Sequence, residues 1–202
     1  MSKVTCDLSI SADGCSAGHG QSEERPFGDD GGDGSGAKLH AWMFETPEEN
    51  RAELARMGAA GAFIMGRNMF GPVRGAWDRD WNGWWGEDPP FHAPVFVLTH
   101  HRRDPQPMAG GTTFHFVTDG IGSALERARE AAGERDVAVQ GGATTVNQYL
   151  AAGLIDELRL HIAPVVFGAG TRLFEGVGPL GLEQVESRAA TGVTHVTYRV
   201  VK

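Results

Sequence analysis

Residues 137–146 of the chain are VAVQGGATTV, and this stretch decides the fold. Its apolar, β-branched start predicts a strand, Gly141-Gly142 a tight turn, and the spacing of Val146, Tyr149 and Leu150 a helix that ends at Gly153. The N-terminus of such a helix presents unpaired N–H groups and partial positive charge, and glycines let an anion approach the backbone. The stretch therefore predicts an anion site; the alternative is that the two glycines only turn a corner.

Outward from this stretch, short apolar strands alternate with helices. Strands are predicted at residues 62–65, 94–99 and 113–118. Ile121, Ala124, Leu125, Ala128 and Ala132 form a helical stripe that ends at Gly133. This alternation predicts a largely parallel sheet covered on both faces, with ligands at the carboxyl ends of its strands.

The two ends of the chain complete the expected sheet. Residues 3–11 are a predicted strand that ends at the turn pair Asp13-Gly14. Thr46-Pro47-Glu48-Glu49 predicts a helix start, with Thr46 as the N-cap, and that helix ends at Gly58. After a long strand at 155–166, strands at 182–190 and 193–201 predict an antiparallel edge hairpin.

Composition and charge limit the function classes. The 202 residues, 41% of them apolar, fit one domain spanning 1–202. A net charge of −8 argues against nucleic acid or an anionic membrane as the main partner. No apolar run approaches the roughly 20 residues of a membrane span, and no signal peptide is evident, so we expect a cytoplasmic protein. Two cysteines support neither a disulfide framework nor a zinc site, and no metal is expected.

Two basic turns follow predicted strands. Gly66-Arg67-Asn68-Met69 could hold a phosphate with Arg67 and the following N–H groups, or could be an ordinary surface loop. His100-His101-Arg102-Arg103 suits the extra phosphate of a phosphorylated dinucleotide, or is a solvated basic corner. The histidines lack a carboxylate or cysteine at ligand spacing, which excludes a metal site there.

Two long segments without regular patterning remain. The polar, glycine-rich residues 15–37 form either a disordered linker or a loop that covers the site, and we favour the covering loop. Trp77, Trp81, Trp84 and Trp85 form either an aromatic wall over a flat substrate or a satellite core or dimer interface.

The order of these motifs resembles the dihydrofolate-reductase-like superfamily, and most closely the stand-alone relatives of the C-terminal reductase domain of the bifunctional riboflavin-biosynthesis deaminase/reductase. The resemblance covers nearly the whole chain. The motifs that carry it are Ser11-Ala12-Asp13-Gly14, AGHGQS at 17–22, LHAWMF at 39–44, MGRNMF at 65–70, VLTH at 97–100, QGGAT at 140–144 and PVVFGAG at 164–170.

This resemblance implies a three-layer α/β fold around a mixed, mostly parallel sheet, a homodimer, and NADPH as the hydride donor. It implies a pyrophosphate turn with a cis peptide bond between Gly141 and Gly142. By the same resemblance, other cofactor contacts come from the 66–69 loop, from the 2′-phosphate turn, and from the loop that starts the nicotinamide cover. The implied cofactor-binding residues are Ser11, Gly14, Gly66, Arg67, Asn68, Met69, Thr99, His100, Arg102, Gly141, Gly142, Ala143, Thr144 and Thr145.

The expected activity is NADPH-dependent hydride transfer to a C=N or C=O of a small flat heterocycle. The implied substrate contacts are Gln21, His40, Trp42 and Trp77, and Asp13 is the expected proton donor unless it only forms an Asp-Gly turn. Leu39 and His40 stand where dihydrofolate reductase has an acidic residue that contacts the pterin, which disfavours folate reduction. The zinc signature of the deaminase is absent. A non-catalytic dinucleotide-binding dimer and a true dihydrofolate reductase remain the alternatives.

Overall fold

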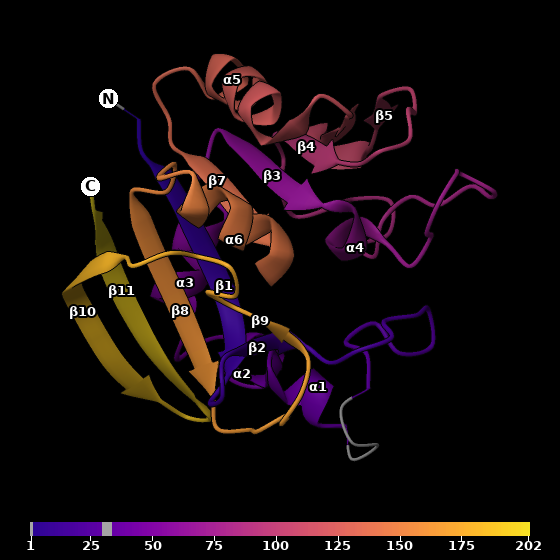
Figure 1. The fold of residues 1–202 in the computed structure, drawn as a ribbon. Coiled ribbons are helices and arrows are strands. Elements are labelled where there is room, and N and C mark those ends of the chain that lie inside the picture. Colours follow the sequence, from indigo (N-terminus) through magenta and orange to yellow (C-terminus); the bar gives the residue numbers. More distant parts are fainter. Residues whose placement is uncertain (1, 30–33) are drawn as a thin grey trace.

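The computed structural model describes residues 2–29 and 34–202, and a nine-stranded sheet forms its centre (Figure 1). Across the sheet the strand order is β10-β11-β8-β1-β7-β3-β4-β6-β5. The strands are β1 (Val4–Ser11), β3 (Ala62–Gly66), β4 (Pro94–Leu98), β5 (Gln106–Pro107), β6 (Thr113–Val117), β7 (Val137–Gly141), β8 (Glu157–Ala163), β10 (Gly181–Ala190) and β11 (Val193–Val201). A separate two-stranded sheet pairs β2 (Cys15–Ala17) with β9 (Thr171–Arg172).

The central strands are parallel, which brings their carboxyl ends to one edge. β8, β1, β7, β3, β4 and β6 pair in parallel along the sheet. β11 pairs antiparallel with both β8 and β10, so the C-terminal hairpin forms the antiparallel edge that the sequence predicts. The mixed, mostly parallel sheet is confirmed.

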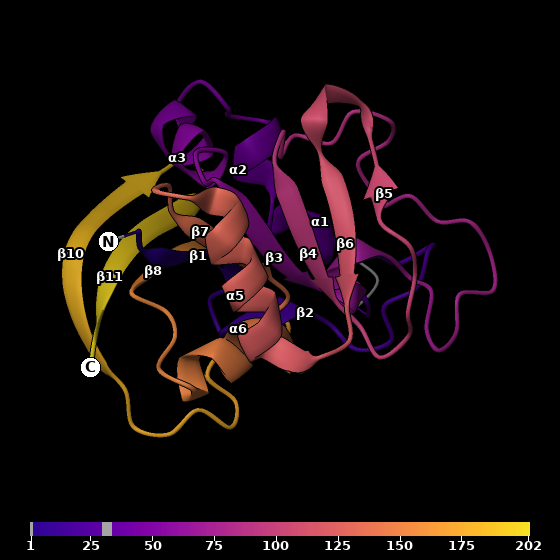
Figure 2. The ribbon, with the colours of Figure 1, turned by 90° about the horizontal axis from the view of Figure 1, so that it is seen from above.

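Helices cover both faces of this sheet (Figure 2). α5 (Gly120–Ala132) and α6 (Ala143–Ala151) cover one face, and the short helices α2 (Ala41–Phe44) and α3 (Arg51–Met57) lie on the other. A single turn, α1 (Ser35–Lys38), precedes α2. A further single turn, α4 (Arg67–Phe70), follows β3 directly. The arrangement is the expected three-layer fold.

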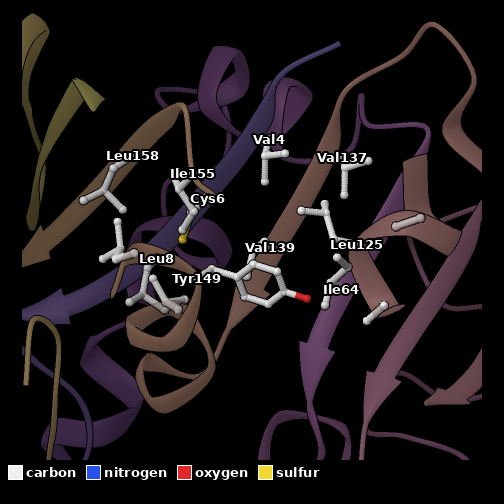
Figure 3. Packing of buried hydrophobic residues seen from close by; sticks show 14 of the residues in the cluster. Val4, Cys6, Leu8, Ile64, Leu125, Val137, Val139, Tyr149, Ile155 and Leu158 are labelled. Carbon is white, nitrogen blue, oxygen red and sulfur yellow. The ribbon is translucent and has the colours of Figure 1, made fainter. Parts of the chain in front are cut away.

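Two apolar clusters hold the layers together. The larger one lies between the sheet and α5 and α6, where Leu125 and Tyr149 pack against Val139 and Ile64 (Figure 3). The Tyr149 hydroxyl donates a hydrogen bond to the Ile121 carbonyl at 2.9 Å, so its one polar atom is satisfied. The smaller cluster lies on the opposite face around Phe63, Phe70 and Phe114, and Trp77, Trp81 and Trp85 pack against it.

The helix expected to begin at Thr46 begins later, which corrects that prediction. Residues 47–50 form turns, and α3 has Asn50 as its N-cap residue. The Thr46 hydroxyl donates to the Trp42 carbonyl at 3.3 Å and accepts from Asn50 Nδ2 at 3.1 Å. Because this hydroxyl serves the end of α2, it does not cap a helix of its own. The predicted end at Gly58 is confirmed.

Two other boundaries differ from expectation. The strand predicted at 155–166 is β8 and ends at Ala163, because Pro164 has no N–H group to continue the ladder. Within the predicted loop at 15–37 the structure has β2 and α1, while residues 30–33 lie outside the described part. No helix in the described residues is both long and apolar enough to cross a membrane.

Candidate functional site

A cavity of about 990 Å³ opens where the carboxyl ends of the parallel strands meet. Its wall includes residues from the ends of β3 and β4, the start of α6, and Asp7, Leu8 and Ser9 of β1. This volume lies at the upper end of the usual range for ligand pockets. The position is the one that parallel α/β sheets use for ligands.

The N-terminus of α6 forms one wall of the cavity. Gly142 is its N-cap residue, and Ala143, Thr144 and Thr145 follow in the lining. Gly141 has φ of +117°, a value that favours glycine, and the peptide bond between it and Gly142 is cis, as the resemblance implies. A side chain at Gly142 would meet nothing within 4 Å and would enter open space. This end of α6 therefore offers the backbone and the partial positive charge that an anion needs.

The end of β3 packs closely against this turn. Gly66 lies beside Thr145, and a Cβ at Gly66 would collide with the Thr145 hydroxyl. Thus glycine at 66 brings the 66–69 loop against the start of α6. Gly66, Arg67, Asn68 and Met69 all line the cavity.

Three arginines gather beyond this loop. Burial, together with the neighbouring Arg74 and Arg103 guanidinium groups, lowers the pKa of Arg67, which nevertheless stays charged. In the described part of the chain none of the three has a carboxylate oxygen within 4 Å. Arg67 Nη2 is buried without a hydrogen-bond partner among those residues. Arg67 and Arg74 line the cavity, so an anion there would gain charge-assisted hydrogen bonds.

Trp77 supports this arginine cluster from behind. The Arg67 guanidinium lies 3.6 Å from the centre of the Trp77 ring, and Arg103 lies on the same ring at 4.8 Å. The Trp77 indole N–H donates to the His101 carbonyl at 3.1 Å. Trp77 is not among the residues that line the cavity. Trp77, Trp81 and Trp85 pack against the smaller apolar cluster, which agrees with the alternative that these residues form a satellite core. Trp84 and Trp85 also line the cavity.

The opposite part of the cavity is bounded by β1, α2 and the loop after β2. Gln21 and Phe27 of this loop line it together with His40, whose ring stacks on Phe27 with centres 5.0 Å apart. Burial lowers the pKa of His40 to about 4, so the ring is neutral at pH 7. Its Nδ1 atom is buried and has no hydrogen-bond partner in the part of the chain described. Residues of the 15–37 loop, which we expect to cover the site, thus form part of the cavity wall.

Most of the expected site residues meet at this cavity. Those that line it are Gly66, Arg67, Asn68, Met69, Thr99, His100, Gly142, Ala143, Thr144, Thr145, Gln21 and His40. Those outside the lining are Ser11, Asp13, Gly14, Arg102, Gly141, Trp42 and Trp77. Trp42 is buried behind the wall, and its indole N–H donates to Ser9 Oγ at 3.2 Å.

Asp13, the expected proton donor, lies outside the cavity lining and forms hydrogen bonds within the protein. Its carboxylate accepts hydrogen bonds from Ser11 Oγ at 2.6 Å, from the Phe167 N–H at 3.1 Å and from the Gly168 N–H at 2.9 Å. These bonds, that of Ser11 first, lower the pKa of Asp13. A carboxylate held ionised and away from the cavity wall is poorly suited to donate a proton. Asp13 instead fixes the loop after β8 to the turn after β1.

Sequence reasoning missed several residues of the wall. Asp7, Ser9, Arg74 and Gln140 line the cavity and were not among the expected contacts. The sequence does contain a signal for Asp7, the one charged residue of its strand, because a charged side chain is rarely buried without a partner. In the described residues no group of three or more His, Cys, Asp or Glu side chains is arranged to hold a metal ion.

Comparison with known proteins agrees with this architecture. The sequence pattern of the RibD C-terminal domain family matches residues 2–196. The uncharacterized protein YyaP of Bacillus subtilis is 34% identical over 106 residues, which is 52% of this chain and 52% of YyaP. The chain thus aligns with about half the length of this curated relative.

Solved structures share the fold at low sequence identity. A protein of Shewanella sp. PV-4 described as a candidate riboflavin biosynthesis protein has a TM-score of 0.65 and 22% identity, with 99% of both chains covered. A Thermotoga maritima diaminohydroxyphosphoribosylaminopyrimidine deaminase/5-amino-6-(5-phosphoribosylamino)uracil reductase gives 0.61 and 15%, with 99% of this chain and 57% of that one covered. A pyrimidine reductase-like protein of Corynebacterium diphtheriae gives 0.58 and 15%, with coverage of 100% and 92%.

We predict that Asp13→Ala destabilises the protein at neutral pH. The loss of three hydrogen bonds to one carboxylate should lower the free energy of unfolding by about 1.5–3 kcal/mol. Because folding lowers the pKa of this group, its contribution is present above the unfolded-state value of about 3.9 and is lost as the pH falls through the folded-state value. Urea unfolding at pH 7 and at pH 3 measures both effects, with the exposed Asp104→Ala as control. Equal stabilities of the parent and Asp13→Ala at pH 7 would contradict this role.

Proposed function

The chain belongs to the RibD C-terminal domain family, and we propose that it is an NADPH-dependent reductase that transfers a hydride to a C=N or C=O of a small flat heterocycle. The observation that carries this proposal is a single cavity with two different ends. One end offers the start of α6 together with Arg67 and Arg74, which have no ion-pair partner among the described residues. The other end offers the polar groups Asp7, Ser9 and His40. The reductases named among the structural neighbours support the same reaction class.

The residues of the first end fit a phosphorylated dinucleotide. The N-terminus of α6 suits a pyrophosphate. Arg67 Nη2, which is buried and has no hydrogen-bond partner among the residues that the structure describes, suits a further phosphate near Arg74 and His100. When bound, NADPH would supply the hydride, since that chemistry belongs to the cofactor. The protein would orient the two partners and exclude water from between them.

The second end favours an enzyme over a protein that only binds the dinucleotide. Gln21 and Phe27 line this part of the cavity together with Asp7, Ser9 and His40. We propose that the substrate binds here, beside the nicotinamide. A protein that used only the nucleotide would not need this polar, covered space. An acidic residue contacts the pterin in dihydrofolate reductase, and Asp7 places a carboxylate in this wall. Dihydrofolate therefore belongs among the heterocycles to be tested.

We further infer a cytoplasmic protein. Both cysteines, Cys6 and Cys15, are buried and free, as is typical of proteins from reducing compartments.

Substitution of Gly142 tests the pyrophosphate position. Because a side chain at Gly142 enters open space, Gly142→Val should fold, but it should fill the volume that the phosphates need. We predict at least tenfold weaker NADPH binding by calorimetric titration, equivalent to about 1.4 kcal/mol. Gly178→Val, at another glycine with nothing within 4 Å, is the control for the added side chain.

The same variants test turnover. NADPH oxidation should be measured with a panel of small heterocycles, dihydrofolate and quinones, and at least one compound should be reduced by the parent and by Gly178→Val. Undiminished NADPH binding by Gly142→Val would place the pyrophosphate elsewhere. Tight NADPH binding without reduction of any compound would favour the non-catalytic alternative.

Cofactor preference tests the arginine cluster. The parent should bind NADPH at least tenfold more tightly than NADH, because a phosphate gains charge-assisted hydrogen bonds that a ribose hydroxyl lacks. Arg67→Ala should abolish this preference and leave NADH affinity unchanged within about a factor of two. Arg102→Ala should have the smaller effect, since Arg102 is exposed and outside the cavity lining. Equal affinity of the parent for both cofactors would overturn the assignment.

We also propose a homodimer that covers the outer edge of β10. This ten-residue strand ends the order of the sheet, and the side chain of Val185 at its middle is 55% exposed. In the described part of the chain no strand pairs with this outer edge, whose other exposed side chains include Glu183 and Glu186. Free backbone groups at a sheet edge favour pairing with a second copy, and Val185 would add an apolar contact. Light scattering should give twice the mass of the chain at micromolar concentration. Val185→Lys should shift the measured mass toward that of the monomer. Val166→Lys, at an exposed loop valine, is the control and should leave the mass unchanged. A monomer mass for the parent across this range would contradict the proposal.

A further inference from the structure

Beside the substrate end of the cavity, β1, β8 and β11 carry buried polar side chains on the face opposite α5 and α6. Asp7 of β1 is in register with Arg159 of β8, and Ser9 is opposite His161. His161 is in turn opposite His195 of β11. Asp7, His161 and His195 are 3%, 2% and 5% exposed. Neighbouring positions on one face of a sheet thus bring a carboxyl group and two imidazoles into contact.

Asn50 fixes the far end of this arrangement. Its Nδ2 group donates to the Trp42 carbonyl at 3.1 Å and to the Thr46 carbonyl at 2.9 Å, so the amide nitrogen is the atom on that side. Its Oδ1 atom accepts from Arg188 Nη2 at 2.8 Å and contacts His195 Nε2 at 2.9 Å. An amide oxygen can only accept, so Nε2 of His195 must carry a proton.

The proton on Nε2 of His195 determines which ring nitrogen of His161 carries a proton. Burial, and then the neighbouring His161, lowers the pKa of His195 to about 4, so His195 is neutral at pH 7 and its Nδ1 carries a lone pair. The two Nδ1 atoms of His161 and His195 are 2.7 Å apart. One of them must donate, and only His161 Nδ1 can. Neutral His161 would therefore have a bare lone pair on Nε2.

Nε2 of His161 lies 3.6 Å from Oδ1 of Asp7. Both atoms are buried, and neither has a hydrogen-bond partner in the part of the chain that the structure describes. With no proton between them, a carboxylate oxygen and an imidazole lone pair would face each other as two unsatisfied acceptors. A buried polar atom without a hydrogen-bond partner destabilises the folded protein, so a proton on one of the two atoms is favoured.

The charges around the pair allow this proton to be exchanged. Arg159 Nη1 donates to Asp7 Oδ2 at 3.2 Å and favours the carboxylate, while Glu157 pairs with the same arginine. From the other elements, His195 and His40 are neutral at pH 7, and Glu53 on α3 pairs with Arg188. The Trp42 ring lies on His161 with centres 4.5 Å apart and keeps this side of the pair dry.

We propose that Asp7 and His161 together hold one exchangeable proton, and that Asp7, in the cavity wall, delivers it to the substrate. This inference rests on the proposed reductase function. As the hydride adds to the carbon of the C=N or C=O bond, the π electrons move to nitrogen or oxygen, and that atom takes the proton from the pair. The products are the reduced substrate and NADP⁺, and a solvent proton then restores the pair. Asp7 is the proton donor and His161 is a positioning residue.

The proton can be counted without any substrate. The full chain labelled with ¹⁵N-histidine and ¹³C-aspartate should be studied by NMR at pH 7, both free and with NADP⁺. His161→Gln and Asp7→Asn assign the two signals. We expect protonated Nδ1 on His161, protonated Nε2 on His195, and one proton on either His161 Nε2 or the Asp7 carboxyl. An ionised Asp7 together with an unprotonated His161 Nε2 would overturn the proposal.

Turnover then tests the catalytic role, with the compound that the parent reduces fastest as the probe. Asp7→Asn and His161→Gln should each lower kcat at least tenfold and leave the Kd for NADPH unchanged. The rate of the parent should fall as rising pH removes the proton from the pair, and both variants should lose this dependence. The exposed His92→Gln and Asp104→Asn should behave as the parent does.

The experiments distinguish a failure of the proton-donor assignment from a failure of the proposed reductase function. Unchanged kcat in Asp7→Asn, with the parent active, would overturn the proton donor and leave the reductase intact. If no compound is reduced, the proposed function fails, and with it the catalytic role of Asp7, whatever the proton count. If Asp7→Asn does not fold, the NMR count on the parent still decides whether the pair holds a proton.

Discussion

The close approach of Gly66 to Thr145 is the constraint on which the site depends. Because no side chain separates them, the end of β3 can reach the start of α6, and the two elements form one continuous wall. β3 and β7 are neighbouring parallel strands, so their carboxyl ends already lie together, and the glycine removes the last steric barrier. Arg67 follows Gly66 directly and is thereby placed in the same wall as the helix N-terminus.

The regular elements could be predicted because their signals are local. The apolar stretches at 62–65 and 137–141 and the stripe along α5 depend only on residues a few positions apart, and the structure places these elements where expected. The start of α3 could not be predicted from the same kind of signal. Thr46 has the right spacing for a cap, but its hydroxyl bonds to Trp42 and Asn50. Which partner a short polar side chain selects depends on how α2 is packed, and no local pattern contains that information.

The parts of the candidate site that glycine-containing turns form could be predicted from the sequence. The parts that depend on contacts between side chains far apart in the chain could not. The turn at Gly141-Gly142 and the 66–69 loop were expected because glycines after strands identify them. The role of Asp13 was not, since its partners Phe167 and Gly168 lie more than 150 positions along the chain. Trp77 was expected against the substrate and instead supports Arg67 from behind. Strand alternation alone would have placed Asp7 and Ser9 on one face, but only the pairing of β1 with β8 brings His161 to them.

An acidic protein can hold an anionic cofactor because electrostatic interactions in a cavity are local. The net charge of −8 is spread over a surface where exposed pairs such as Arg199 with Glu183 are screened by water and salt. Arg67 is partly withdrawn from water, lies against Trp77 and has no ion-pair partner in the described residues, so its field inside the cavity is much less screened. The same withdrawal from water acts at the opposite end, where Asp7 Oδ1 and His161 Nε2 face each other and have no hydrogen-bond partner in the described part of the chain. Limited access of water thus has opposite consequences at the two ends: it favours an added negative charge beside Arg67, and it favours an added proton between Asp7 and His161.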